Sequence, residues 1–378
     1  SKKMKKIVFL TGTRADFGKI KSLIKVIESN KNYKYHIFAT GMHLNSIYGS
    51  TVQEIYKSGF SNVYEFTNQK ANKHYDMDIT LSKTILGFSN FIKGLRPDLI
   101  VIHGDRVEAL AGAIVGSLNN ILTAHIEGGE LSGTIDDLIR HSASKLSHIH
   151  FVSNKKAKKR LIQMGELSNS IFVIGSPDVD LMNSKLLPNL QKVKSRYEIN
   201  FNHYAIAILH PVTTEIELLE SQTNIFFEAI EKSLKNFVVI YPNNDLGNEI
   251  IIERIKKIKS ERVKIFPSVR FEYFLTLLKN ASFIIGNSST GIREAAYFGI
   301  NCINVGSRQS NRSNSNHIIN VDFDVNNLGK SIQEIKNIHF KSNLNNEFGN
   351  GNSDILFLDV LQSEKFWETN IQKQFQDI

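Results

Sequence analysis

The sequence predicts an α/β fold in which two Rossmann-like, doubly wound domains face a central cleft. Short apolar runs alternate with helical patterns along the whole chain, as is typical of parallel sheets covered by helices. The chain has 378 residues, more than one core usually requires, and this length favours two domains. A polar stretch rich in Asn and Lys follows Gly175-Ser-Pro177 and is the expected linker.

Each half of the chain supplies its own series of apolar runs. A helix is expected at Ile20–Ser29, because its apolar residues Ile20, Leu23, Ile24 and Ile27 fall on one stripe. The strands expected in the first half are Lys6–Thr11, Tyr35–Thr40, Val63–Phe66, Leu99–His103, Leu122–Ile126, Ile149–Val152 and Ile171–Ile174. Those expected in the second half are Ala205–Leu209, Phe237–Tyr241, Val263–Phe266, Phe283–Ile285, Cys302–Val305 and Ile318–Val321.

The composition is that of an ordinary globular protein, with 41% hydrophobic and 22% charged residues. The formal net charge of +9 suits an anionic ligand. The basic run from Lys155 to Arg160 is interpreted as the solvated face of a helix, because no nucleic-acid-binding motif accompanies it. We therefore expect no nucleic acid among the partners.

Several features predict a cytoplasmic protein. The single cysteine, Cys302, lies in an apolar stretch, which excludes a disulfide within the chain and favours a reducing compartment. The basic start is followed by an apolar run too short for a signal peptide. No apolar stretch approaches the length needed to span a membrane, so a membrane partner is not expected.

The most informative segment runs from Gly286 to Glu294, directly after an expected strand. Ser288 and Ser289 would cap a helix that continues to Gly299, and unpaired backbone N–H groups at such a helix start bind phosphate. The carboxylate of Glu294 could accept hydrogen bonds from both hydroxyls of a ribose. The alternative is an ordinary strand-to-helix turn with serine caps.

A second candidate phosphate contact follows the first expected strand. The segment from Gly12 to Lys19 resembles a P-loop, but the glycines are one residue too far apart and Ile20 replaces the magnesium-binding hydroxyl. Arg14 and Lys19 lie near a helix start, and both can meet phosphate oxygens. The alternative is that Lys19 is merely solvated and only Arg14 contributes.

Acidic residues follow the fourth and fifth expected strands of the first half. In a sheet ordered 3-2-1-4-5, Arg14, Asp105, Arg106 and Glu127 would gather beyond one sheet edge, where ligands bind in such folds. Asp105 could instead be a helix N-cap, whereas Glu127 is followed by two glycines rather than by a cap.

Asp136 begins a further helix and completes a group of three carboxylates. Its alternative role is an ion pair with Arg140, four residues later on the same helix face. Carboxylates that lie close together acquire separated pKa values by mutual repulsion, and acid–base work on a sugar ring needs that separation.

The second half contributes polar residues after its own strands. His210 could bind a phosphate or donate a proton to a leaving group, although a histidine at a strand end is often structural. The amide of Asn243 could contact a base or ribose, and Arg308 could reach a diphosphate. His148 and His150 alternate along a strand, but no third ligand stands at suitable spacing, so a metal site is not predicted.

Taken together, these motifs resemble the hydrolysing UDP-N-acetylglucosamine 2-epimerases of sialic-acid synthesis (the NeuC type). The likeness runs in order over nearly the full chain. It is carried by Gly12-Thr-Arg-Ala-Asp16, His103-Gly-Asp-Arg106, His125-Ile-Glu-Gly-Gly129 with Ser132-Gly-Thr-Ile-Asp-Asp137, His210-Pro-Val-Thr-Thr214 and Gly286-Asn-Ser-Ser289.

The resemblance implies a glycosyltransferase B-type fold with the active site between the domains. It implies a first domain at 1–180, completed by a C-terminal helix at 362–378, and a nucleotide-binding domain at 181–361. It also implies a UDP-sugar substrate, no nicotinamide or other cofactor, no obligatory metal, and a homodimer. The implied catalytic residues are Asp105, Glu127, Asp136 and His210. The implied nucleotide-binding residues are Arg14, Arg106, Asn243, Val269 beside the uracil, Ser288, Ser289, Glu294 and Arg308.

In the family that this sequence resembles, the non-hydrolysing members carry a longer loop between the positions of Glu127 and Asp136. They also have Glu at the position of Asp136. The shorter loop in this chain therefore favours release of N-acetylmannosamine and UDP. Alternatives remain: a GDP-linked or 2,4-diacetamido sugar nucleotide as substrate, a glycosyltransferase of the same fold, or a nucleotide-sugar sensor without catalysis.

Overall fold

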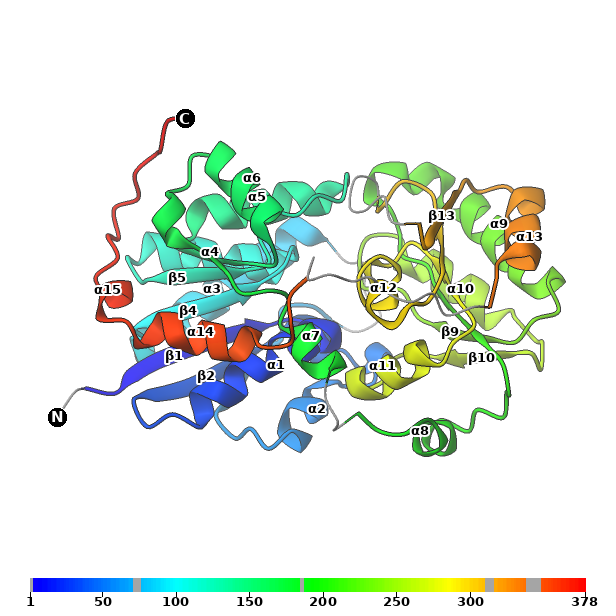
Figure 1. Ribbon diagram of the computed structural model, residues 1–378, viewed down its shortest axis with the longest axis horizontal. Coiled ribbons are helices and arrows are strands. Elements are labelled where there is room, and N and C mark those ends of the chain that lie inside the picture. Colours follow the sequence, from blue (N-terminus) through cyan, green and yellow to red (C-terminus); the bar gives the residue numbers. More distant parts are fainter. Residues whose placement is uncertain (1–2, 71–75, 184–186, 310–315, 338–347) are drawn as a thin grey trace. The chain divides into compact units, whose positions relative to one another are not determined.

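The computed structural model describes residues 3–70, 76–183, 187–309, 316–337 and 348–378. The chain divides into two compact units (Figure 1). Unit 1 comprises Ser1–Glu130, Asp136–Ser184 and Asn346–Ile378. Unit 2 comprises Leu131–Ile135 and Lys185–Asn345. The last part of the chain therefore returns to the unit in which the chain begins.

Unit 1 is built on a seven-stranded parallel sheet with the order β3-β2-β1-β4-β5-β6-β7. The strand order reverses between β1 and β4: β2 and β3 lie on one side of β1, and β4 to β7 lie on the other. This position is the switch point of the sheet, beside which ligands bind in such folds. The strands are β1 Lys5–Thr11, β2 Tyr33–Ala39, β3 Val63–Glu65, β4 Leu99–His103, β5 Thr123–Ile126, β6 Ile149–Val152 and β7 Ile171–Val173.

Helices cover both faces of this sheet because successive side chains of a strand point to opposite faces. The α-helices of unit 1 are α1 Arg14–Glu28, α2 Val52–Lys57, α3 Met77–Leu95, α4 Val107–Leu118, α5 Ile135–Leu146, α6 Lys155–Gln163, α7 Asp178–Met182, α14 Ser353–Gln362 and α15 Glu364–Trp367. Short 3-10 helices lie at Gly41–Leu44, Ser46–Tyr48 and Ser168–Ser170.

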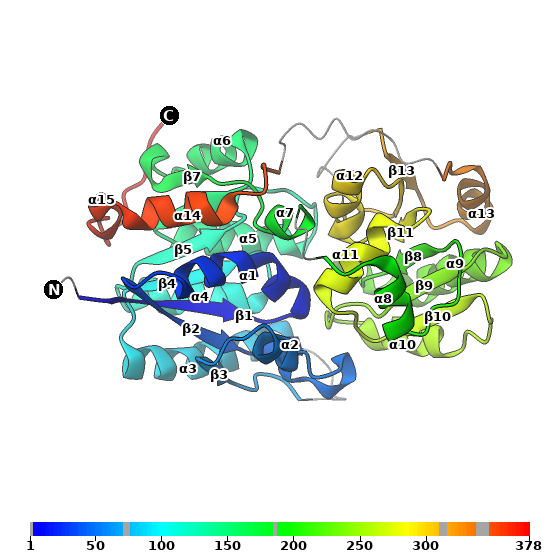
Figure 2. The same ribbon diagram turned by 60° about the horizontal axis from the view of Figure 1, so that its bottom comes forward.

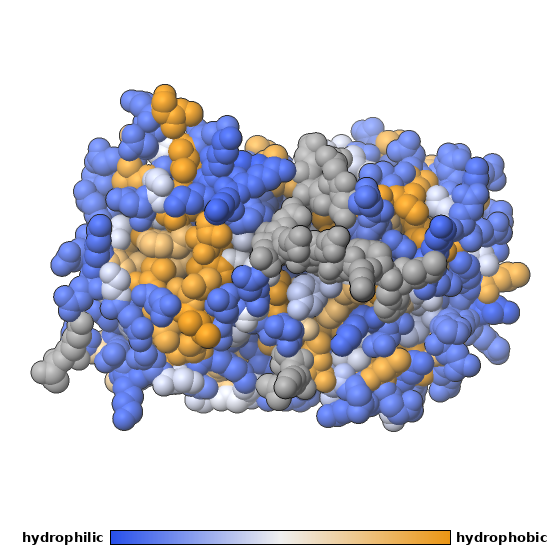
Figure 3. Space-filling model, in the orientation of Figure 1, coloured by the Kyte–Doolittle hydropathy of each residue, from blue (hydrophilic) through white to orange (hydrophobic). Residues whose placement is uncertain are grey.

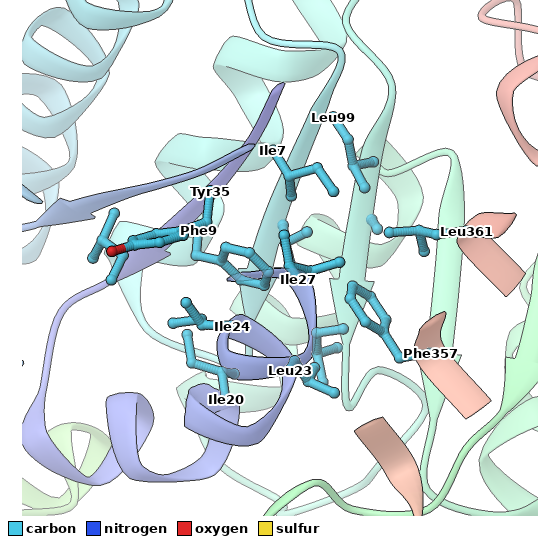
Figure 4. Packing of buried hydrophobic residues seen from close by; sticks show 14 of the residues in the cluster. Ile7, Phe9, Ile20, Leu23, Ile24, Ile27, Tyr35, Leu99, Phe357 and Leu361 are labelled. Atoms are coloured by element: carbon cyan, nitrogen blue, oxygen red, sulfur yellow. The ribbon is translucent and has the colours of Figure 1, made fainter. Parts of the chain in front are cut away.

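The alternation is plain along β1. Ile7 and Phe9 pack against α1 and α14 on one face, where Phe357 of α14 enters the same core (Figure 4). Val8 and Leu10 pack against α3 and α4 on the other face. Helices α1 and α14, far apart in the sequence, lie side by side (Figure 2). The end of the chain is thus part of the core of unit 1.

The expected C-terminal helix at 362–378 is wrong in its position. The helical residues are those of α14 and α15, and 368–378 has no helix. The apolar residues of this part that are buried, Phe357, Leu361 and Phe366, all precede residue 368, and Ile371 is only partly buried against the same core. The tail is instead held as an extended segment, because the Gln376 N–H donates to the Gly165 carbonyl at 2.9 Å and the Lys373 ammonium pairs with the buried Glu166.

Unit 2 repeats the layered plan with a six-stranded parallel sheet of order β10-β9-β8-β11-β12-β13. Its strands are β8 Ala205–Ile208, β9 Phe237–Ile240, β10 Val263–Phe266, β11 Ile284–Gly286, β12 Cys302–Val305 and β13 Ile318–Val321. Its helices are α8 Leu190–Arg196, α9 Leu219–Lys232, α10 Asn248–Lys256, α11 Phe271–Lys279, α12 Glu294–Phe298 and α13 Val325–Glu334, with 3-10 helices at Thr213–Leu218 and Ser289–Gly291.

Two buried clusters flank the second sheet. Helices α9, α10 and α13 pack on one face, and α8, α11 and α12 pack on the other. The predicted fold class is therefore confirmed: each unit is a parallel sheet between two helical layers. Every expected strand is present, and the bounds differ by at most two residues.

Within the described ranges, no helix combines the length and apolar character needed to cross a bilayer. On the face drawn in Figure 3, hydrophilic side chains predominate, and a cluster of hydrophobic side chains lies at the left of the view.

The contribution of α14 to the core of unit 1 can be measured directly. Phe357 is fully buried, and its ring centroid lies 4.9 Å from that of Phe151. We expect Phe357→Ala to lower the free energy of unfolding by about 3–5 kcal/mol, because it removes a large buried ring and leaves a cavity. Urea titration followed by the fluorescence of Trp367, the only tryptophan, reports on this region.

Ile355 on the same helix provides the matched control, since its side chain is 57% exposed. Ile355→Ala should change the free energy of unfolding by less than about 0.5 kcal/mol. Equal effects of the two substitutions would show that α14 does not contribute to the core as described.

Candidate functional site

The polar residues of unit 1 gather beyond the carboxyl ends of β1, β4 and β5. The strands β4 and β5 are in register, with His103 paired to Ile126. The residues that follow them therefore leave the sheet at the same edge. Asp105 and Glu127 were predicted to meet at this edge, and the structure places both there.

His103, the last residue of β4, lies between two carboxylates. Its Nδ1 is 2.8 Å from Oδ1 of Asp16 in α1, and its Nε2 is 3.3 Å from Oε2 of Glu127. Burial alone would lower the pKa of His103, but hydrogen bonds and charge attraction from Asp16 and Glu127 outweigh it and raise the pKa to about 9. His103 is therefore an imidazolium at neutral pH.

Glu127 itself is held in an unusual backbone conformation. Its φ is +67°, a left-handed value that costs a non-glycine residue on the order of 1 kcal/mol. The next residues have no room for side chains, since a Cβ on Gly129 would lie 2.4 Å from the Ala157 carbonyl oxygen. The Glu127 N–H donates to the Phe151 carbonyl at 2.8 Å. The side chain, only 4% exposed, is thereby fixed beside His103.

Asp105 has its own buried cation. Arg140 of α5 is 1% exposed and forms ion pairs with Asp105 and, at 2.6 Å, with Asp137. Burial opposes the charge of Arg140, but attraction to Asp105 and its acidic neighbours raises its pKa. The predicted alternative of an N-cap role for Asp105 is not what the structure shows, because Arg106 stands at the N-cap position of α4.

The predicted alternative for Asp136 also needs correction. Arg140 pairs with Asp137, three residues earlier, rather than with Asp136, four residues earlier. The reason is that Arg140 turns toward Asp105 beyond the end of β4, and Asp137 lies on that side of α5. Asp136 is half-buried in the first turn of α5.

Sequence reasoning missed His125, which supports this arrangement from within the sheet. Its Nε2 donates to the Gly104 carbonyl at 2.7 Å, and its Nδ1 lies 2.8 Å from the Ser144 hydroxyl. Burial lowers the pKa of His125 to about 3, so the ring is neutral. His125 thus ties the turn that carries Asp105 to helix α5. Its buried place in an apolar strand was the only available signal.

Three of the basic residues expected to bind phosphate lie in unit 1. Arg14 begins α1, and its guanidinium is 3.1 Å from Glu54. Arg106 has its Nε 4.0 Å from the carboxylate of Glu108. Lys19 is half-buried on α1. Phosphate binding by these three residues stays a prediction.

Glu108 is a second residue that the sequence did not single out. Its side chain is 2% exposed, and Asn68 donates to it at 3.3 Å. Burial raises the pKa of this carboxyl. It packs directly beneath Gly12, where a Cβ would lie 3.1 Å from the Glu108 side chain. Glu108 therefore supports the loop after β1.

In unit 2, Asn287 organises the residues predicted for nucleotide binding. Its side chain accepts from the His210 N–H at 2.7 Å and donates to the His210 carbonyl at 2.9 Å. Its own carbonyl accepts from Arg308 at 3.0 Å. The Asn243 N–H donates to Nδ1 of His210 at 2.9 Å. His210, Asn243 and Arg308 are thus brought together by a buried residue that sequence reasoning did not choose.

This bonding defines the tautomer of His210. Because Nδ1 accepts a backbone N–H, the proton of the neutral ring is on Nε2. His210 therefore presents a donor at Nε2, which is the form that binds phosphate oxygens. His210 follows β8, which lies beside β11 in the sheet.

The strand-to-helix segment after β11 differs from the prediction. Ser288 caps a one-turn 3-10 helix, Ser289–Gly291, by accepting from the Thr290 N–H at 3.3 Å, and α12 begins only at Glu294. Ser289 is therefore not a helix cap. Gly286, at φ +139°, lies so close to β8 that a Cβ would be 1.8 Å from the Ile208 carbonyl oxygen. A side chain at this position would therefore clash with β8.

Other predicted residues occupy apolar or buried places. Glu294 is 1% exposed at the start of α12. Val269 belongs to the buried cluster beneath α11. His148 accepts from the Thr123 N–H at 3.0 Å, and His150 pairs with Glu166 at 2.6 Å. These two histidines therefore make structural contacts in the interior of unit 1. Lys155, Lys156 and Lys159 are exposed on α6, as predicted for a solvated face.

Two Rossmann-like units define an α/β protein of the glycosyltransferase B-type fold. The chain belongs to the UDP-N-acetylglucosamine 2-epimerase family, whose sequence model matches residues 25–362. It is 46% identical over 378 residues to the UDP-N-acetylglucosamine 2-epimerase of Neisseria meningitidis serogroup B, covering 99% of this chain and 100% of that protein. It is 35% identical to the UDP-N,N'-diacetylbacillosamine 2-epimerase (hydrolyzing) of Legionella pneumophila, covering 88% of this chain and 89% of that protein.

The same fold is found in the crystal structure of the Methanocaldococcus jannaschii UDP-GlcNAc 2-epimerase in complex with UDP-GlcNAc and UDP. The two share 24% identity with a TM-score of 0.78, covering 95% of this chain and 99% of that one. The likeness shows a common fold.

The role of Asn287 in unit 2 can be tested by Asn287→Asp. The variant keeps the acceptor for the His210 N–H but places a carboxylate oxygen against the His210 carbonyl, a buried acceptor left without its donor. We expect the opening free energy of β8 and β11 to fall by about 2 kcal/mol. Hydrogen exchange followed by mass spectrometry measures it. Asn327→Asp, on the exposed first turn of α13, should change it by less than about 0.5 kcal/mol.

Proposed function

We propose that this protein is a hydrolysing UDP-N-acetylglucosamine 2-epimerase, which converts UDP-N-acetylglucosamine to N-acetylmannosamine and UDP for sialic-acid synthesis. The observation that carries the proposal is the pair of carboxylates Asp105 and Glu127 at one sheet edge, each with its own buried cation. The likeness to the Neisseria meningitidis enzyme over both full lengths supports this choice of substrate.

The proposed chemistry has two steps. A carboxylate removes the proton from carbon 2 while the bond from carbon 1 to the diphosphate breaks, giving 2-acetamidoglucal and UDP by anti elimination. Water then adds at carbon 1. Carbon 2 receives a proton on the face opposite to the one from which its proton was removed. Asp105, Glu127 and Asp136 are the proposed acid–base groups, and each positioned group contributes about 10²–10⁴-fold.

The separate cations give these carboxylates different surroundings. Glu127 stands beside the imidazolium of His103, whereas Asp105 stands beside the guanidinium of Arg140. Arg140 stays charged at every accessible pH, but His103 can lose its proton at alkaline pH. Two carboxylates whose environments differ in this way are suited to different protonation states in one cycle.

The nucleotide is proposed to bind through basic and donor groups. Arg14, Lys19, Arg106, His210 and Arg308 are the groups proposed to neutralise the departing diphosphate. The Nε2–H of His210 is a suitable donor because its tautomer is fixed by Asn243. We further propose that Ser288 and Ser289 contact phosphate, that Glu294 binds the ribose, and that Val269 lies beside uracil.

Hydrolysis rather than retention of the nucleotide is supported by the segment before α5. The connection between Glu127 and Asp136 is short, and residue 136 is Asp rather than Glu. Both features match the hydrolysing members of the family that the sequence resembles. The lone buried thiol of Cys302 fits a cytoplasmic enzyme, and the resemblance supports a homodimer.

A 2,4-diacetamido sugar nucleotide is the second candidate substrate. The similarity to the Legionella pneumophila enzyme, over most of both chains, favours it specifically. The proposed elimination and hydration would be the same for this substrate, because the second acetamido group lies at carbon 4 and does not react.

The test is turnover in deuterium oxide, followed by proton NMR with no acceptor present. Incubation with UDP-N-acetylglucosamine should release N-acetylmannosamine carrying deuterium at carbon 2, together with UDP. UDP-N-acetylmannosamine as the product would contradict hydrolysis. Turnover of a 2,4-diacetamido sugar nucleotide alone would establish the second candidate, and no turnover of either would favour a transferase or a sensor.

Glu127→Gln tests the acid–base role of this residue. The amide keeps the shape of the side chain but cannot take a proton, so we expect kcat to fall at least about 10³-fold while the Kd for UDP changes by less than about threefold. Calorimetric titration gives the Kd. Glu253→Gln, on the exposed side of α10, is the matched control and should retain wild-type turnover. Wild-type turnover by Glu127→Gln would remove this residue from the mechanism.

A further inference from the structure

Asp16, in the first turn of α1, uses both of its carboxylate oxygens. Oδ2 accepts from the Gly12 N–H at 2.8 Å and from the Thr11 hydroxyl at 2.9 Å. Oδ1 lies 2.8 Å from Nδ1 of His103. The helix is capped by Thr13, whose hydroxyl accepts from the Asp16 N–H at 3.0 Å. Asp16 is thus not needed as a cap, and its second oxygen is directed at His103.

The ring of His103 connects Asp16 to Glu127. Nδ1 faces Asp16 and Nε2 faces Glu127 at 3.3 Å, and all three side chains are at most 14% exposed. Nδ1 shares a hydrogen bond with Asp16, whereas Nε2 and the Glu127 carboxylate are in ion-pair contact without hydrogen-bond alignment. The three side chains therefore form a carboxylate–imidazolium–carboxylate chain across the switch point of the sheet.

The groups around the ring are consistent with this charge. Asp16 faces His103 from α1, Glu127 faces it from the end of β5, and His125 of β5 is neutral. His43, which shares the Thr11 hydroxyl with Asp16, is also neutral, since burial lowers its pKa to about 4. The imidazolium charge is thus balanced by Asp16 and Glu127.

We propose that Asp16 is a positioning residue of the acid–base site. It holds the proton on Nδ1 of His103 and keeps the cationic ring beside Glu127, so that the charge of the ring stabilises Glu127 as a carboxylate. The inference rests on the proposed function, in which Glu127 exchanges a proton with the sugar. In this proposal Asp16 acts on the reaction through His103, its hydrogen-bond partner.

Asp16→Asn tests the chain of contacts. The amide oxygen can still accept from Gly12 and Thr11, but the amide nitrogen would donate to Nδ1 and leave His103 neutral. We expect the pKa of His103, measured by NMR on histidine-labelled protein, to fall from about 9 by about two units. We expect kcat to fall about 10- to 100-fold with KM within threefold, and the alkaline limb of the kcat profile to move to lower pH by the same two units.

Asp180→Asn is the matched control. Asp180 of α7 is a partly buried carboxylate that accepts at 3.0 Å from Ser22, which lies on α1 as Asp16 does. Asp180 does not contact His103. This variant should keep kcat within about twofold and leave the His103 titration unchanged. A merely structural role of Asp16 would lower the stability of Asp16→Asn without moving the alkaline limb.

Each outcome decides the inference. A fall in the His103 pKa with an unchanged kcat and pH profile would overturn it, as would a fall in kcat with an unchanged His103 titration. If Asp16→Asn fails to fold, the wild-type titration decides: a pKa near 9 that matches the alkaline limb supports the inference, and one near 6.5 overturns it. Failure of the proposed function appears separately, as absence of sugar-nucleotide turnover by the wild type.

Discussion

The site of unit 1 depends on one constraint: the carboxylates beyond the ends of β1, β4 and β5 are paired with buried cations. Taking a charge out of water costs several kcal/mol unless an opposite charge and hydrogen bonds compensate it. Arg140 is 1% exposed and is compensated by Asp105 and Asp137. His103 is compensated by Asp16 and Glu127. Each buried cation requires its carboxylates in place, so the folding of this part of unit 1 depends on the acidic cluster.

The parallel sheet explains why these groups meet at all. Strands β1, β4 and β5 end at the same edge, and the reversal of strand order between β1 and β4 separates the helices that follow them. Side chains from α1, from the ends of β4 and β5, and from α5 then converge although they are far apart in the sequence. His125 and Glu108, buried beneath the loops, hold the backbone turns that present them.

The sequence was sufficient for the strands and for the placement of Asp105 and Glu127 beyond one sheet edge, because apolar runs bounded by glycine and polar residues mark the strand ends. It did not reveal Asp16, since the bond to His103 joins residues 87 positions apart. It did not reveal Asn287, whose role lies in hydrogen bonds to a backbone 77 positions away. The sequence pattern also did not reveal the 3-10 turn at Ser289–Gly291, or the extended tail whose Lys373 pairs with Glu166, 207 positions away.

The central claim is that His103 carries a proton on each ring nitrogen and so gives Glu127 a permanent cationic neighbour at neutral pH. Neutron diffraction from deuterated crystals of the full chain near pH 7.5 measures this directly. The account predicts nuclear density for deuterium on both Nδ1 and Nε2 of His103, and none on the carboxylates of Asp16 and Glu127. A ring with a single deuterium, or one on the Glu127 carboxyl, would contradict it.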